Sequence, residues 1–141
     1  MLLAKARERG GTERVWMKSA IAERELGNTD EERTLLDEGL KRFPSFFKLW
    51  LMFGQLEERL GYMEKATEVY DSGLKHCSSC VTLWLLLAKL EEKINGLGKA
   101  QAVLTMARKK NPQSPELWLA AVRAESRHVY EKEADILMAK E

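Results

Sequence analysis

The 141-residue sequence has almost no excess of charge of either sign, with 23 lysines and arginines against 22 aspartates and glutamates. Such a balance creates no overall field that would attract nucleic acid or an anionic membrane. The sequence also lacks any apolar run close to the roughly 20 residues that a membrane-spanning helix needs. We therefore expect neither general electrostatic binding to RNA nor a membrane-spanning segment.

Cysteines are also few, and the sequence begins without an apolar leader. The chain contains two cysteines, and its first nine residues mix leucine with lysine, arginine and glutamate. We therefore expect no secretory signal peptide, and so few cysteines without such a signal favour a reducing compartment. Apolar residues make up 45% and charged residues 32% of the chain, which is typical of a folded domain rather than a disordered one.

What the sequence does contain is a regular spacing of tryptophan. Its four tryptophans are separated by 34 residues each time: Trp16, Trp50, Trp84 and Trp118. Four residues after each tryptophan lies a small or β-branched residue: Ala20, Gly54, Ala88 and Val122. Seven residues after each tryptophan lies a glutamate: Glu23, Glu57, Glu91 and Glu125. Internal spacing of this kind indicates a stacked repeat.

Each repeat is predicted to contain two antiparallel helices. A glycine or asparagine eleven residues after the tryptophan (Gly27, Gly61, Asn95) can end the first helix in a left-handed conformation, whereas Val129 breaks this pattern in the fourth repeat. We expect first helices near residues 13–26, 47–60, 81–94 and 115–129. Second helices are expected near 30–42, 64–76, 98–110 and 131–140, and one more helix at 2–9.

The predicted fold is therefore all-α, a right-handed superhelical solenoid of antiparallel helix pairs. Residues 1–11 would be the tail of a preceding repeat, 12–45, 46–79 and 80–113 complete repeats, and 114–141 a truncated repeat. Both ends would then interrupt a repeat and leave apolar side chains exposed to solvent, among them Leu3, Ile136, Leu137 and Met138. We expect such a chain to self-associate through a terminus.

The repeat resembles the tetratricopeptide repeat in its length and in its Trp, small-residue, Gly, Ala and Pro positions. Tetratricopeptide repeats usually carry an aromatic residue where this chain has glutamate four times, and that glutamate is typical of the half-a-TPR, or HAT, repeat. Segments 6–20, 39–44 and 48–52 are also similar to the HAT repeats of pre-mRNA splicing scaffolds. The resemblance implies a nuclear, non-enzymatic scaffold in pre-mRNA splicing that bridges snRNP components of the tri-snRNP, with no cofactor and no small-molecule substrate.

Apolar residues directly after the tryptophans form the candidate partner-binding row. In tetratricopeptide repeats the matching positions line the concave groove, and chaperone-binding members place lysine and asparagine there to hold a peptide carboxylate. This chain has instead Met17, Leu51, Met52, Leu85, Leu86 and Leu119. The row either packs between neighbouring first helices or forms an apolar groove for a partner helix or an extended peptide.

Other motifs favour structural explanations over chemistry. Cys77 and Cys80 form a CxxC pair, but zinc requires four ligands and only His76 lies nearby as a third. We therefore expect the two thiols to belong to a turn and to the core. Neither His76 nor His128 has a nucleophile or an acid at a fixed spacing, so we expect no catalytic or metal site. The repeated glutamates are expected to accept hydrogen bonds within or between helices.

Two alternative functions stay open at the level of sequence. An RNA-binding helical repeat would need a basic stripe with exposed aromatic residues. The basic clusters, such as Lys41 and Arg42, instead end second helices, where cations complement the helix dipole. A tetratricopeptide-type co-chaperone adaptor would need the carboxylate-binding residues that this chain lacks. Direct RNA contact is therefore undecided, and spliceosomal snRNP proteins are the expected partners.

Replacing Trp84 by alanine is expected to destabilise the chain by about 3–5 kcal/mol, because truncation of a buried aromatic side chain leaves a cavity. Urea titrations of the wild type and of Trp84→Ala, giving the free energy of unfolding, test this expectation. A variant that unfolds at the same urea concentration as the wild type would show that this tryptophan position is not structural.

Overall fold

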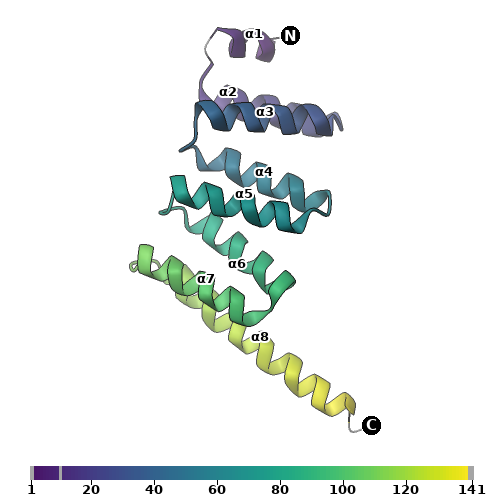
Figure 1. Ribbon diagram of the computed structural model, residues 1–141, viewed down its shortest axis with the longest axis vertical. Coiled ribbons are helices and arrows are strands. Elements are labelled where there is room, and N and C mark those ends of the chain that lie inside the picture. The colour runs from purple at the N-terminus through teal and green to yellow at the C-terminus, as the bar shows by residue number, and fades with distance from the viewer. Residues whose placement is uncertain (1, 10, 140–141) are drawn as a thin grey trace. The chain divides into compact units, whose positions relative to one another are not determined.

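The computed structural model describes residues 2–9 and 11–139, apart from the side chains of residues 128, 130 and 131. Contacts divide the chain into two compact units, Met1–Cys77 and Ser78–Glu141. The described part of the chain contains eight helices and no strands (Figure 1). The first unit holds α1 (Leu2–Glu8), α2 (Glu13–Glu25), α3 (Thr29–Arg42), α4 (Phe47–Arg59) and α5 (Met63–His76). The second unit holds α6 (Val81–Asn95), α7 (Leu97–Lys110) and α8 (Pro115–Ala139).

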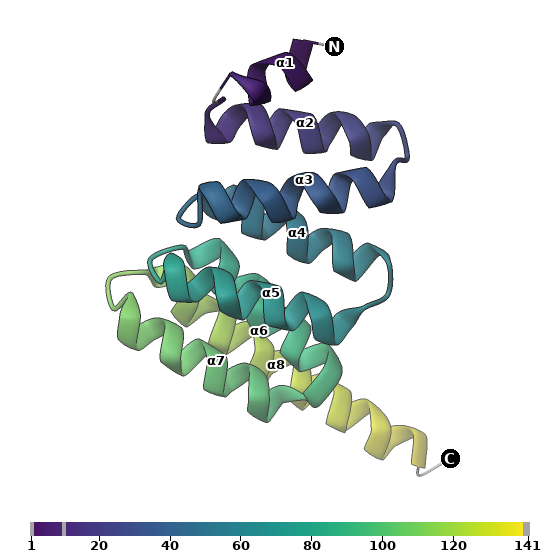
Figure 2. The ribbon, with the colours of Figure 1, turned by 45° about the horizontal axis from the view of Figure 1, so that its top comes forward.

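Consecutive helices form antiparallel pairs, α2 with α3 and α4 with α5 in the first unit, and α6 with α7 in the second (Figure 2). The turn inside each pair of the first unit contains a glycine with positive φ, 79° at Gly27 and 86° at Gly61. The next backbone N–H then reaches back to close the helix, from Asn28 to the carbonyl of Glu23 and from Tyr62 to that of Glu57, each at 2.9 Å. These hydrogen bonds satisfy carbonyl groups that would otherwise have no donor at the helix end.

The turn of the third pair differs by one residue from the prediction. Asn95 was expected to end the first helix, but it is the last residue of α6, and Gly96 takes the positive φ of 88°. Glycine has no Cβ and adopts this conformation at a lower cost than asparagine. Helix α6 therefore continues to Asn95, and the turn is made at Gly96, where positive φ has a lower free-energy cost.

The core of the first unit lies between α2, α3 and α4. It is built from buried side chains at helical spacing: Trp16, Ala20, Leu35, Leu36, Leu40, Leu49, Met52 and Leu56. Phe43, Phe46 and Phe53 pack against this cluster from its edge. Because α4 belongs to the second repeat, one continuous core joins the first repeat to the second.

The closest approach inside a pair is that of α4 to α5. Tyr70 of α5 is fully buried, and its ring lies directly over the Cα of Gly54, so that a Cβ added there would overlap the ring. The Tyr70 hydroxyl donates a 2.6 Å hydrogen bond to the Glu58 carboxylate. Burial, together with this carboxylate, raises the pKa of Tyr70 far above its usual value, which keeps the phenol protonated as a donor. A small residue at position 54 thus allows α5 to approach α4 closely.

In the second unit, α8 is a single helix of 25 residues. Its first turns pack on the α6–α7 pair through Leu117, Ala121 and Ala124, which are buried. The prediction of two helices, 115–129 and 131–140, is wrong for the described residues, since the helix continues without a break to Ala139; residue 140 lies outside them. The other repeats turn at a glycine, whereas this one has Val129, whose branched side chain does not favour positive φ.

Helix pairs at a 34-residue interval confirm the predicted all-α helical-repeat fold. Helix bounds agree with the predicted ones to within one or two residues in the first three repeats. No described helix is both long enough and apolar enough to cross a membrane.

Replacing Gly54 by alanine is expected to destabilise the chain by about 1–3 kcal/mol, because the added methyl group must displace a buried, hydrogen-bonded ring. This loss outweighs the roughly 1 kcal/mol that alanine gains over glycine inside a helix. The measurement is the free energy of unfolding in urea.

Gly98 of α7 provides the matched control, since a Cβ added there meets no atom within 4 Å. Gly98→Ala should leave stability unchanged or raise it by up to about 1 kcal/mol. Equal effects of the two substitutions would contradict a role of Gly54 in helix approach.

Candidate protein-interaction surface

Two of the four tryptophans tie a helix to the turn that precedes it. The indole N–H of Trp50 donates to the carbonyl of Pro44 at 2.7 Å, and that of Trp84 donates to the carbonyl of Ser78 at 2.8 Å. Both acceptors lie six residues before the tryptophan, in the turn between repeats. The residue at the equivalent distance from Trp16 is residue 10, which lies outside the described residues. The turn residue at this repeat position, Pro44 or Ser78, therefore lies where one helix has ended and also provides a backbone carbonyl that accepts from the next tryptophan.

The burial of the tryptophans differs along the chain. Trp16 and Trp84 are buried, and Trp50 is half-buried with its ring stacked on His76 at 5.5 Å between centroids. Trp118 was expected to be a core residue, but 55% of it is exposed, and its ring carries the Arg108 guanidinium at 4.4 Å. The reason is local: α8 does not turn back, so no second helix of its own repeat covers Trp118.

The repeated glutamates behave as expected in three repeats. Glu23 accepts a hydrogen bond from the Asn28 amide at 2.7 Å, and Glu91 accepts one from the Asn95 amide at 2.8 Å. Glu57 is fully buried and accepts from Arg33. Glu125 is exposed on α8, where the turn that would bring an amide toward it is absent.

Two ion pairs cross between α3 and α4 in opposite directions. Arg33 of α3 donates to Glu57 of α4 at 2.9 Å, and Arg59 of α4 donates to Glu32 of α3 at 2.9 Å. Both carboxylates are buried, while the guanidinium groups are 32% and 45% exposed. Each helix thus contributes one buried acid and one partly exposed base to the contact between two repeats, an arrangement that the sequence analysis did not find.

The candidate partner-binding row divides into three levels of exposure. Met17, Leu51, Leu85 and Leu86 are half-buried, and Leu119 is 51% exposed. Met52 does not belong to an accessible row, because it is 8% exposed and lies in the core of the first unit. In this repeat Met52, two positions after Trp50, packs in the core, whereas Leu51 is half-buried and keeps surface that a partner can contact.

Basic side chains end the second helices. They are Lys41 and Arg42 in α3, Lys75 and His76 in α5, and Arg108, Lys109 and Lys110 in α7. Lys41 pairs with Asp37 at 3.3 Å, and Lys75 pairs with Asp71 at 3.9 Å, four residues earlier in each helix. Lys41 and Lys75 therefore have acidic partners within their own helices, which agrees with a role at the helix ends.

The cysteine pair does not form part of a metal cluster in the part of the chain that the structure describes. Cys77 is half-buried after the end of α5, and Cys80 is buried before the start of α6. No group of three or more His, Cys, Asp and Glu residues among the described positions could hold a metal ion. The side chain of His128 lies outside the described residues.

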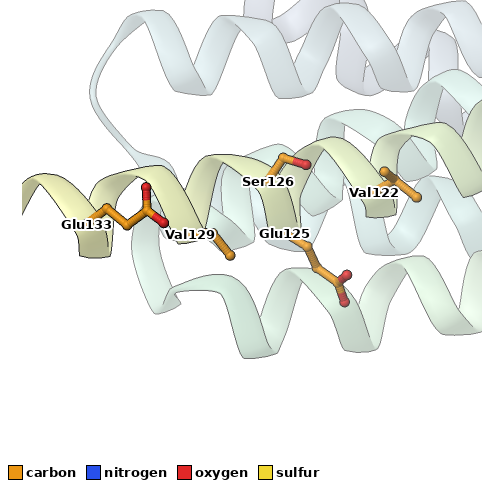
Figure 3. Close-up of a pocket in the computed structure, with 5 residues that line it drawn as sticks. All are labelled: Val122, Glu125, Ser126, Val129 and Glu133. Atoms are coloured by element: carbon orange, nitrogen blue, oxygen red, sulfur yellow. The ribbon is translucent and has the colours of Figure 1, made fainter.

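A groove of about 380 Å³ runs along the outer side of α8 (Figure 3). Among the described side chains, five of that helix line it: Val122, Glu125, Ser126, Val129 and Glu133. They lie on the side away from Leu117, Ala121 and Ala124, which pack on α6 and α7. This face of α8 is therefore open between Val122 and Glu133.

Comparison with protein families identifies the repeat. The model described as the PRP39 N-terminal HAT repeat matches residues 13–89, and a tetratricopeptide repeat model matches residues 81–124. Protein STABILIZED1 of Arabidopsis thaliana is 85% identical over 48 residues, which are 34% of this chain and 5% of that protein. The match thus covers a small part of the length of this curated relative.

Solved structures agree with the fold at low sequence identity. A type III secretion complex from Aeromonas hydrophila has a TM-score of 0.64 at 17% identity, covering 92% of this chain and 89% of that chain. The type III secretion chaperone SycD of Yersinia enterocolitica, in complex with a peptide of the translocator YopD, has a TM-score of 0.63 at 15% identity, covering 84% and 92%. At such identities the likeness concerns the arrangement of helices.

Replacing Arg33 by alanine is expected to destabilise the chain by about 2–3 kcal/mol, because it leaves the buried Glu57 carboxylate without its partner. Arg127→Ala is the control. Arg127 pairs with Glu92 at the same 2.9 Å, but both side chains are more exposed, at 55% and 26%. Its loss should cost about 0–1 kcal/mol. Urea unfolding of both variants measures the difference, and equal costs would argue against a structural role of the crossed pairs.

Proposed function

Because the chain belongs to the family of PRP39 N-terminal HAT repeats, we propose that it is a protein–protein interaction scaffold of pre-mRNA splicing. More narrowly, the chain acts in the nucleus as part of a protein like pre-mRNA-splicing factor 6, bridging snRNP components of the tri-snRNP without catalytic activity. The similarity of segments 6–20, 39–44 and 48–52 to the HAT repeats of that factor supports this assignment.

The observation that carries the proposal is the apolar row on the first helices. Met17, Leu51 and Leu85 stay half-buried after folding, so each keeps apolar surface that a partner can cover. A partner helix or extended peptide would bury the remaining surface and gain about 1 kcal/mol for each of these half-buried side chains, roughly half the value of full burial. SycD, a helical-repeat protein of similar fold, was solved with a bound peptide, which is consistent with such a use of the fold.

Protein partners suit these surfaces better than RNA. The basic ends of α3 and α5 are paired with Asp37 and Asp71. Among the described residues, the exposed aromatic rings with a cation over them are Tyr62, with Lys65, and Trp118, with Arg108 from the basic end of α7, so that each ring has one cation over it. Single-stranded RNA recognition needs bases stacked on aromatics beside a continuous basic track. A near-neutral chain that buries Trp16 and Trp84 and half-buries Trp50 offers few exposed indole rings and little excess of basic charge.

The test is capture from nuclear extract by the immobilised chain, read out by quantitative mass spectrometry of tri-snRNP proteins with and without nuclease. A double variant, Leu51→Gln with Leu85→Gln, should lower the captured amount about tenfold or more, because losing the contacts of two half-buried leucines costs roughly 1.5–3 kcal/mol together. The matched control, Glu38→Gln with Glu68→Gln, changes two exposed positions of second helices and should capture as the wild type does.

Circular dichroism of each variant confirms that helix content is kept. Capture that disappears after nuclease treatment would assign the contact to RNA. Capture of tri-snRNP proteins that is equal for both double variants would place the binding surface elsewhere.

A further inference from the structure

Exposed apolar side chains are concentrated on α8. Of the large apolar side chains that are exposed among the described residues, seven belong to this helix: Trp118, Leu119, Val122, Val129, Ile136, Leu137 and Met138. From residue 132 to residue 139 every described side chain is exposed. Apolar side chains exposed in such number along one helix mark an interaction site.

The corresponding face of an earlier helix shows what kind of element covers it. In α4, Trp50 and Gly54 face the antiparallel helix α5, through Gly73 and Tyr70. The same repeat positions of α8 are Trp118 and Val122, and neither is covered. The face is therefore shaped for an antiparallel helix, and no helix of the described second unit lies on it.

The stripe on α8 repeats at the spacing of a coiled coil. Leu119, Val122, Ser126, Val129, Glu133 and Ile136 follow one another at intervals of three and four residues. Residues with this spacing lie on one side of a helix and face a neighbouring helix. The groove on α8 runs along the middle of this stripe, from Val122 to Glu133 (Figure 3).

We propose that this stripe binds the same stripe of a second copy of the chain, as an antiparallel, two-fold symmetric pair of α8 helices. In this register Leu119 faces Ile136 of the second copy, Val122 faces the stem of Glu133, and Ser126 faces Val129. Each contact occurs twice, because a two-fold interface is self-complementary.

Charge on one flank of the stripe favours this orientation. Glu125 and Lys132 are seven residues apart and lie on the same flank, both exposed. Antiparallel pairing brings Glu125 of each copy beside Lys132 of the other, which gives two attractive pairs. In a parallel, in-register pair these flanks would lie on opposite sides of the interface, so that Glu125 and Lys132 would form no such pairs. The occupant is thus a second copy of this chain, and the interaction is independent of the proposed role in splicing.

Sedimentation equilibrium of the intact chain from about 1 to 100 μM measures the association, a range in which dissociation constants of weak to moderate complexes are resolved. The wild type should form dimers within this range. Val129→Lys should weaken the dimer about tenfold or more, because it places a charge inside the apolar stripe.

Charge reversal gives the decisive comparison, since it changes only exposed side chains. Glu125→Lys should weaken the dimer several-fold, and adding Lys132→Glu to it should restore wild-type association. The control Asp135→Lys makes the same change of charge at an exposed position off the stripe and should have no effect. Three results would overturn the proposal: a wild type that stays monomeric at about 100 μM, a dimer insensitive to Val129→Lys, or a double charge variant that fails to regain association.

Discussion

How closely the two helices of a pair can approach is limited by the size of two residues, one on each helix. On the first helix this is the residue four positions after the tryptophan, and at Gly54 any side chain would meet the Tyr70 ring. On the second helix it is Gly73, where a Cβ would lie 2.8 Å from the Cγ of Trp50. The aromatic side chains fill the space that the small residues leave. Close-packed interiors tolerate little change in either partner.

The contact between repeats depends on this arrangement. With the helices of each pair held at a fixed distance, α3 and α4 lie side by side, and each can bury a glutamate against an arginine of the other. Apolar contacts such as those of Leu36 and Leu49 supply most of the stabilisation. A shift of one helix by a turn would keep much of that apolar contact but leave two buried carboxylates unpaired, so we expect the crossed pairs to select the register.

Much of this fold follows from the tryptophan spacing, and the exceptions have local causes. The interval of 34 residues and the glycines at 27 and 61 were sufficient to predict three helix pairs. The fourth repeat was predicted to turn although Val129 stood in the turn position, and its straight helix explains why Trp118 and Glu125 are exposed. One further signal was present and overlooked: Gly39, Gly73 and Ala107 keep the same interval and are buried.

The crossed ion pairs and the position of Met52 could not be read from the sequence. Glu32 stands where the other repeats have alanine, so the sequence shows it to be an exception. Its partner Arg59, however, lies 27 residues away on a different repeat. Which residues meet across two repeats depends on how α3 and α4 pack, and the repeat pattern does not specify that packing. The same holds for Met52, whose burial depends on its neighbours rather than on its place in the repeat.

The hydrogen bond from a tryptophan indole to the preceding turn has a consequence for how the chain opens. Pro44 ends one repeat and Trp50 belongs to the next, so the bond between them exists only while both are folded. Such a bond adds to the nearest-neighbour coupling of a repeat array, in which fraying of one repeat weakens the next. Local unfolding should therefore spread from one repeat to the next in steps. In amide hydrogen exchange, the N–H groups at these junctions should exchange when either of the two adjoining repeats unfolds.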